Sequence, residues 1–166
     1  MNVDFHDSVM DYLTSIVKSH NANVYVDRSW IPNGGYGLFA QKNIKKDDVV
    51  ISYIGEILNT QTALRRNDKS YLMRLGTQVY IDANNCFLCL ARYINDCRNP
   101  AGHNVIFDKN EYEKCAKIIA TRNIYLGEEL YVDYGKWYWI SIKDSYKMTF
   151  NNLHINKSKL TNFQYD

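Results

Sequence analysis

Residues 90–104, which read LARYINDCRNPAGHN, contain the polar side chains best placed to hold a ligand. This Asn-rich segment follows a short apolar run and leads directly into the strand-like residues 105–107. Polar groups between two apolar runs are held against a buried partner, because unpaired polar groups are costly to bury. We expect that partner to be a ligand.

A second candidate segment contains Gly34, Gly35, Tyr36 and Gly37. Glycine allows the backbone to approach a ligand closely and to adopt positive φ. The apolar residues 38–40 then resume a buried strand. On the motif alone, an ordinary hairpin turn is the simpler interpretation. A Rossmann dinucleotide site would need a helix next, whereas residues 44–53 are β-rich.

Strands and hairpins must position these segments. Residues 71–75 and 79–83 are two β-rich runs that flank three turn-forming residues, which predicts a hairpin. Apolar spacing of three and four residues predicts an amphipathic helix over residues 4–19. We further expect strands at 24–26, 38–40, 49–58, 105–107 and 115–120, a short helix or surface loop at 60–69, and a charged connector at 109–117.

Composition limits the classes of function. The chain has 166 residues and is 46% hydrophobic, which suits one domain with a substantial core. Its 20 Lys and Arg nearly balance its 18 Asp and Glu, and no basic block indicates direct binding to nucleic acid. With no long apolar run and no signal-peptide pattern, we expect a soluble, intracellular protein that does not bind a membrane.

The cysteines raise the question of a zinc site. Cys86 and Cys89 have metal-ligand spacing, but Cys97 and Cys115 are single and do not match a zinc ribbon. Cys89 also lies in an apolar run, where a small buried thiol fits. We therefore expect reduced thiols and no metal.

The motifs and their order resemble those of the SET-domain protein lysine methyltransferases. The family segment R-F-I-N-H-x-C-x-P-N is matched by Arg92-Tyr93-Ile94-Asn95-Asp96-Cys97, and E-L-x-x-D-Y-G by residues 129–135. A G-x-G segment, an E-Y-x-G-E strand at 52–56 and the hairpin at 71–83 also match. No cysteine follows Cys115, so the resemblance is to a SET domain without the cysteine-rich zinc segment.

The resemblance implies a mainly β fold with short helices. In this SET-domain or β-clip fold, small sheets surround a knot-like crossing, preceded here by an N-terminal helix. The implied organisation is an N-terminal helix and linker at residues 1–23, a catalytic domain at 24–140, and a polar tail at 141–166 that is a candidate pocket lid.

The resemblance also implies roles for individual residues, with S-adenosylmethionine as methyl donor. Tyr134 and Tyr53 are the implied catalytic residues. Asp96 stands where the family usually has histidine. The remaining implied residues bind the cofactor (Gly34, Gly35, Tyr36, Gly37, Tyr71, Arg92, Asn95, Asp96 and Trp139) or line the lysine channel (Met73, Val132 and Tyr138).

The implied activity is methylation of a protein lysine in an extended basic segment, with a histone tail as the usual substrate. The protein would then be a nuclear chromatin regulator. The small Val132 favours di- or trimethylation. Two alternatives stay open: a degenerate SET domain that only binds proteins, and a methyltransferase of a non-histone protein. We expect Glu111, Glu113, Glu128 and Glu129 to form an acidic peptide groove or solvated surface, and His103 to be an exposed loop residue.

Overall fold

The computed structural model describes residues 23–140. Two compact units meet in the sequence between Asp133 and Tyr134, inside the predicted catalytic domain. The described part of the first unit contains every strand, and that of the second is helical over residues 136–140. The expected N-terminal helix and the polar tail at 141–166 lie outside the described residues.

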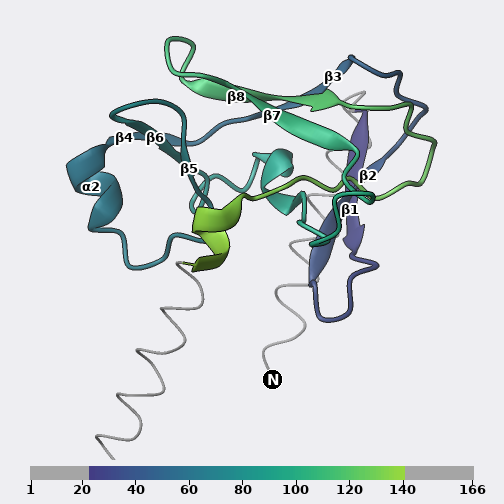
Figure 1. Ribbon diagram of the computed structural model, residues 1–166, viewed down its shortest axis with the longest axis horizontal. Coiled ribbons are helices and arrows are strands. Elements are labelled where there is room, and N and C mark those ends of the chain that lie inside the picture. Colours follow the sequence, from purple (N-terminus) through teal and green to yellow (C-terminus); the bar gives the residue numbers. More distant parts are fainter. Residues whose placement is uncertain (1–22, 141–166) are drawn as a thin grey trace, which may run out of the picture. The chain divides into compact units, whose positions relative to one another are not determined.

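Three small sheets lie in the described part of the first unit, which confirms the mainly β class (Figure 1). All their strand pairs are antiparallel. The sheets are β1 (Val24–Arg28) with β2 (Tyr36–Ala40); β3 (Val49–Tyr53), β8 (Cys115–Ala120) and β7 (Val105–Asn110) in that order; and β4 (Glu56–Asn59), β6 (Val79–Asp82) and β5 (Leu72–Arg74) in that order.

The burial pattern of each strand reflects how its faces are covered. β8 alternates, with Ala116, Ile118 and Ala120 buried, because successive side chains of a strand point to opposite faces. β2 is buried over four consecutive residues, 37–40, so both of its faces are covered, and it is also paired along both edges. One edge pairs with β1, and the other receives backbone hydrogen bonds to and from residues 127–130. The late segment 127–130 thus completes a sheet that begins early in the chain.

Both helices in the described part of the first unit are short. α2 (Thr60–Leu64) begins at Asn59, whose side-chain oxygen accepts a hydrogen bond from the backbone of Thr62 at 2.9 Å. Of the short helix or surface loop expected at residues 60–69, the structure has a short helix over its first half. The 3-10 helix η1 (Leu90–Tyr93) buries Leu90, Ala91 and Arg92 at the start of the Asn-rich segment.

The predicted hairpin at 71–83 is confirmed by the pairing of β5 with β6. The prediction of a charged connector at 109–117 is wrong at both ends. β7 continues to Asn110 and β8 starts at Cys115, so only residues 111–114 form the turn. Charged side chains on the exposed face of a hairpin do not prevent its backbone from pairing. Within residues 23–140, no helix has the length and apolar character needed to span a bilayer.

Candidate functional site

The Asn-rich segment crosses residues 129–132 at two points. Asn95 pairs in parallel with Tyr131, and its carbonyl accepts a hydrogen bond from the backbone of Val132 at 3.0 Å. At the second point the side-chain amide of Asn104 forms two hydrogen bonds with the backbone of the crossing strand. Its Nδ2 donates to the carbonyl of Glu129 at 2.9 Å, and its Oδ1 accepts from the backbone of Tyr131 at 2.8 Å. The predicted crossing is therefore present within the first unit.

A buried carboxylate supports this crossing. Glu129 is only 1% exposed. Its Oε1 accepts hydrogen bonds from Ser29 Oγ at 2.6 Å and from Asn95 Nδ2 at 3.3 Å. Its Oε2 accepts from the backbone of Trp30 at 2.7 Å and from the Tyr131 hydroxyl at 2.6 Å. Four donors offset the cost of removing this carboxylate from water and join the β1–β2 hairpin to the crossing.

The hydroxyl of Tyr131 is held protonated by the same contact. Burial, followed by the hydrogen bond to Glu129, raises the pKa of Tyr131 above its usual value near 10. The hydroxyl therefore remains a hydrogen-bond donor throughout the neutral pH range.

The glycine motif lies in the β1–β2 hairpin, as its pattern alone predicted. Gly35 has φ of +67°, which favours glycine. Gly37 is small for a different reason, because a Cβ there would lie 2.2 Å from Glu129 Oε1. The carbonyl of Tyr36 accepts a hydrogen bond from Asn95 Nδ2 at 2.9 Å. The motif and the Asn-rich segment are thus brought together.

Arg92 presents a buried cation with unused donors. The residue is 9% exposed, and its Nε and Nη1 have no hydrogen-bond partner among the described residues. Its guanidinium carbon lies 3.9 Å from the centroid of the Tyr71 ring and 5.2 Å from that of Phe87. Aromatic faces offset part of the cost of burying the cation. An anionic ligand such as a carboxylate would satisfy the remaining donors.

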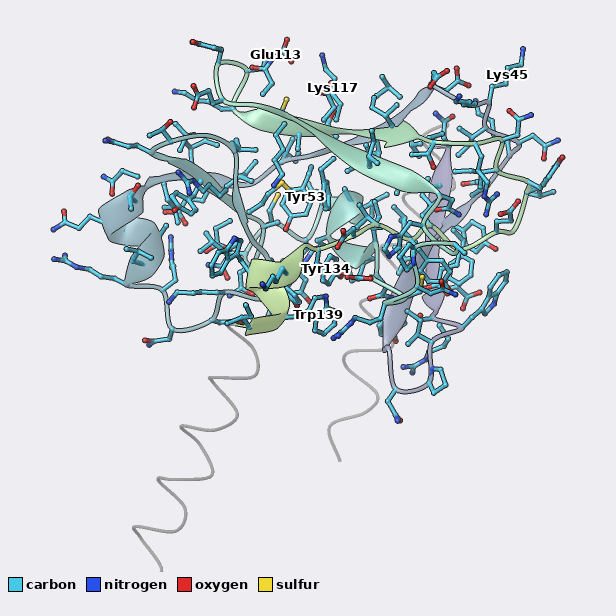
Figure 2. The ribbon with its side chains drawn as sticks, in the orientation of Figure 1. Lys45, Tyr53, Glu113, Lys117, Tyr134 and Trp139 are labelled. Atoms are coloured by element: carbon cyan, nitrogen blue, oxygen red, sulfur yellow. The ribbon has the colours of Figure 1, made fainter. Side chains whose placement is uncertain are left out.

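Tyr53 and Met73 are buried inside the first unit. The Tyr53 hydroxyl donates to the carbonyl of Tyr71 at 2.7 Å, and its ring meets Phe107 edge to face. Figure 2 shows Tyr53 below the β7–β8 hairpin, on the other side from Glu113 and Lys117. Met73 pairs with Ile81 at the centre of the β5–β6 hairpin. Val132 is buried directly after the crossing.

Three further predicted residues belong to the second unit. Tyr134, Tyr138 and Trp139 form an aromatic cluster, with ring centroids of Tyr134 and Tyr138 4.5 Å apart and of Tyr138 and Trp139 5.2 Å apart. The Tyr134 and Trp139 rings are stacked at 6.0 Å. Edge-to-face and stacked arrangements of this kind are favourable for aromatic rings.

Two expectations about charged residues are wrong. His103 is not an exposed loop residue, because its side chain is 17% exposed and its Nε2 lies 3.0 Å from Asp96 Oδ1. Glu129 does not belong to a surface groove, because it is the buried carboxylate of the crossing. Glu128 and Glu113 do remain near the surface, in ion pairs with Arg122 and Lys117 respectively.

The four cysteines are free thiols. Burial raises the pKa of the Cys89 thiol, so it stays protonated, and its sulfur accepts a hydrogen bond from the backbone of Ile54 at 3.3 Å. Over the part of the chain that the structure describes, no group of three or more His, Cys, Asp or Glu side chains is placed to hold a metal ion.

Sheets arranged around a crossing of this kind define a known class of fold. The family model described as "SET domain" matches residues 35–135, more than half of the chain. The chain therefore belongs to the SET-domain family.

Several curated members of that family are similar in sequence to this chain. The chain is 39% identical over 121 residues to the histone-lysine N-methyltransferase trr of Drosophila melanogaster, covering 68% of this chain and 5% of trr. It is 40% identical over 121 residues to the human histone-lysine N-methyltransferase 2D, covering 68% and 2%. A Schizosaccharomyces pombe histone-lysine N-methyltransferase, H3 lysine-4 specific, is 40% identical over 108 residues, covering 59% and 11%. The chain thus spans only a small part of each of these relatives.

Solved structures agree with the fold. An active polycomb repressive complex 2 in the basal state matches with a TM-score of 0.58 and 31% identity, covering 69% of this chain and 15% of that chain. A ctPRC2 structure in an autoinhibited conformation, bound to S-adenosylmethionine, matches with a TM-score of 0.56 and 28% identity, covering 71% and 16%.

Proposed function

We propose that this chain is an S-adenosylmethionine-dependent protein-lysine N-methyltransferase that acts on a histone tail, and that it works in the nucleus. The observation that carries the proposal is the crossing at Asn95 and Tyr131, which joins the glycine motif to the Asn-rich segment through the Asn95 side chain. The similarity to histone-lysine N-methyltransferases supports the reaction class. The S. pombe relative makes the histone H3 tail the first substrate to test.

The residues of the first unit fit the proposed cofactor. The unused donors of Arg92 suit the carboxylate of its methionine part, and the backbone around Gly34–Gly37 and Asn95 lies beside the crossing. Tyr71 supplies the ring against which Arg92 packs, and its hydroxyl is proposed as a further cofactor contact, as the family resemblance implies. Asp96 is proposed to contribute through its backbone, and Trp139 of the second unit is proposed to stack on adenine.

The chain's own groups then prepare the acceptor. The bound cofactor supplies an electrophilic methyl group on a sulfonium. A lysine ammonium, with a free pKa near ~10.4, must lose its proton before it becomes a nucleophile. Apolar and aromatic walls disfavour its charged form, and we assign these walls to Tyr53, Met73, Val132 and Tyr138. The Tyr134 hydroxyl is proposed to orient the amine.

Replacing Arg92 with alanine should weaken cofactor binding about tenfold to a hundredfold, because hydrogen bonds to charged groups contribute about 1.5–3 kcal/mol. Calorimetric titration with S-adenosylmethionine measures the change. Arg74→Ala is the matched control, since the Arg74 guanidinium donates to the turn carbonyls of Gly76 and Thr77. Equal affinities for the two variants would remove Arg92 from the cofactor site.

Replacing Val132 with tyrosine should shift the products toward monomethyl-lysine. We propose di- or trimethylation for the wild type, because valine leaves room and has no hydroxyl to hold a water molecule. Mass spectrometry of methylated histone peptide gives the product distribution. Val132→Phe adds bulk without a hydroxyl and separates the two effects. An unchanged distribution in both variants would contradict the assignment of Val132 to the channel.

The proposal as a whole is tested by incubating the protein with labelled S-adenosylmethionine and mixed core histones. Label on one histone supports the reaction and nominates the substrate. Cofactor binding without label points to a non-histone target. Absence of both binding and label would favour a protein-interaction module instead.

A further inference from the structure

Asp96 and His103 form a bridge within the Asn-rich segment. The Asp96 side chain is 2% exposed, and its Oδ1 accepts hydrogen bonds from the backbone of Arg98 at 2.7 Å and from His103 Nε2 at 3.0 Å. Because a carboxylate oxygen can only accept, the His103 imidazole donates through Nε2 in this pair. We call this pair the Asp96–His103 clasp.

The clasp lies between the two points at which the Asn-rich segment meets the crossing strand. Asp96 directly follows Asn95, which pairs with Tyr131, and His103 directly precedes Asn104, whose amide also bonds to Tyr131. The clasp therefore fixes the distance between the two contacts and closes the loop 97–102.

Asn95 directly precedes the clasp in the chain. Its side-chain amide donates to the Tyr36 carbonyl at 2.9 Å and so connects the clasp to the glycine motif. A displaced Asp96 would shift the Asn95 backbone to which it is joined, and small misplacements in a binding site are costly in affinity and rate.

We propose that His103 is a positioning residue for the cofactor site. It acts through Asp96, which occupies the position where the resemblance implies histidine, and holds Asn95 against the glycine motif. In this chain the imidazole beside position 96 therefore belongs to His103 of the loop, not to residue 96 itself. The proposal rests on the proposed function, because it assumes that the Asn95 region binds S-adenosylmethionine.

The test compares His103→Ala, His103→Gln and Asp96→Ala in the full chain. Calorimetry measures S-adenosylmethionine affinity, and methyl transfer to core histones gives KM and kcat. We expect His103→Ala to raise KM for the cofactor about tenfold, with the loss concentrated in KM, because a buried acceptor loses a donor. His103→Gln keeps an N–H donor and should recover most of the affinity.

Two comparisons separate positioning from general loosening of the loop. Asn99→Ala removes the hydrogen bond from the Ala101 backbone to Asn99 Oδ1 without touching Asp96, and should leave KM unchanged. The double variant His103→Ala/Asp96→Ala should have the same KM for the cofactor as Asp96→Ala alone, because each substitution removes the same hydrogen bond.

The outcomes distinguish the two proposals. A wild-type protein that binds no cofactor overturns the proposed function and the clasp's role with it. Wild-type binding with an unaffected His103→Ala variant overturns the clasp alone. Equal losses of cofactor affinity in His103→Ala and Asn99→Ala would also overturn the clasp. So would a His103→Gln variant whose cofactor affinity is no higher than that of His103→Ala.

Discussion

Replacing Tyr134 with phenylalanine should lower kcat about a hundredfold while cofactor affinity stays within about twofold. The expected loss corresponds to about 2.7 kcal/mol of transition-state stabilisation, the scale for one positioned hydrogen-bonding group. The substitution keeps the aromatic ring that packs with Tyr138 and Trp139, so the cluster itself is retained. Single-turnover methyl transfer and calorimetry measure the two quantities.

Tyr125→Phe is the matched control for this prediction. It makes the same chemical change, and Tyr125 is 64% exposed in the turn before Gly127. Its kcat should equal that of the wild type. Unchanged turnover in Tyr134→Phe would contradict the catalytic role of this hydroxyl, whereas a parallel loss of cofactor affinity would assign it to binding.

Replacing Glu129 with alanine should lower the free energy of unfolding by more than about 3 kcal/mol. The substitution leaves Ser29 Oγ, the Trp30 backbone and the Tyr131 hydroxyl without this acceptor, while Asn95 Nδ2 keeps its hydrogen bond to the Tyr36 carbonyl. Removing one partner from a buried charged network typically costs about 3–5 kcal/mol. For a domain of marginal stability this is a large share of the total. The midpoint of urea unfolding measures it.

The neighbouring Glu128→Ala is the control for this effect. Glu128 bonds to Arg122 at 2.8 Å near the surface, and pairs of that kind contribute at most about 1 kcal/mol. A loss in Glu129→Ala no larger than that in Glu128→Ala would show that the buried carboxylate is not needed for the fold.

Local signals in the sequence predicted much of the fold. The β5–β6 hairpin was predicted because two β-rich runs flank a short turn, and β8 because its apolar residues form a compact run. The charged connector was wrong because Glu111, Glu113 and Lys114 lie in the turn, whereas Lys109 and Lys117 belong to β7 and β8. Periodicity does not separate a polar strand face from a polar loop when the run is short.

The site was less predictable, because its key contacts join segments far apart in the chain. The SET resemblance located Asn95 and the glycine motif, but the four donors of Glu129 come from three separate segments. Its place directly before the buried Leu130 predicted exposure, because neighbouring side chains of an extended segment point to opposite faces. The Asp96–His103 clasp had no local signal, since a loop histidine is usually exposed and its partner becomes evident only in three dimensions.

The second edge of β2 has a consequence for biosynthesis. Residues 36–40 leave the ribosome long before residues 127–130, which hydrogen-bond along that edge. Until the later segment emerges, the nascent chain exposes an unpaired strand edge rich in apolar residues, a surface that promotes intermolecular pairing. We therefore expect cotranslational protection by chaperones to matter most in the interval before residues 127–130 emerge from the ribosome.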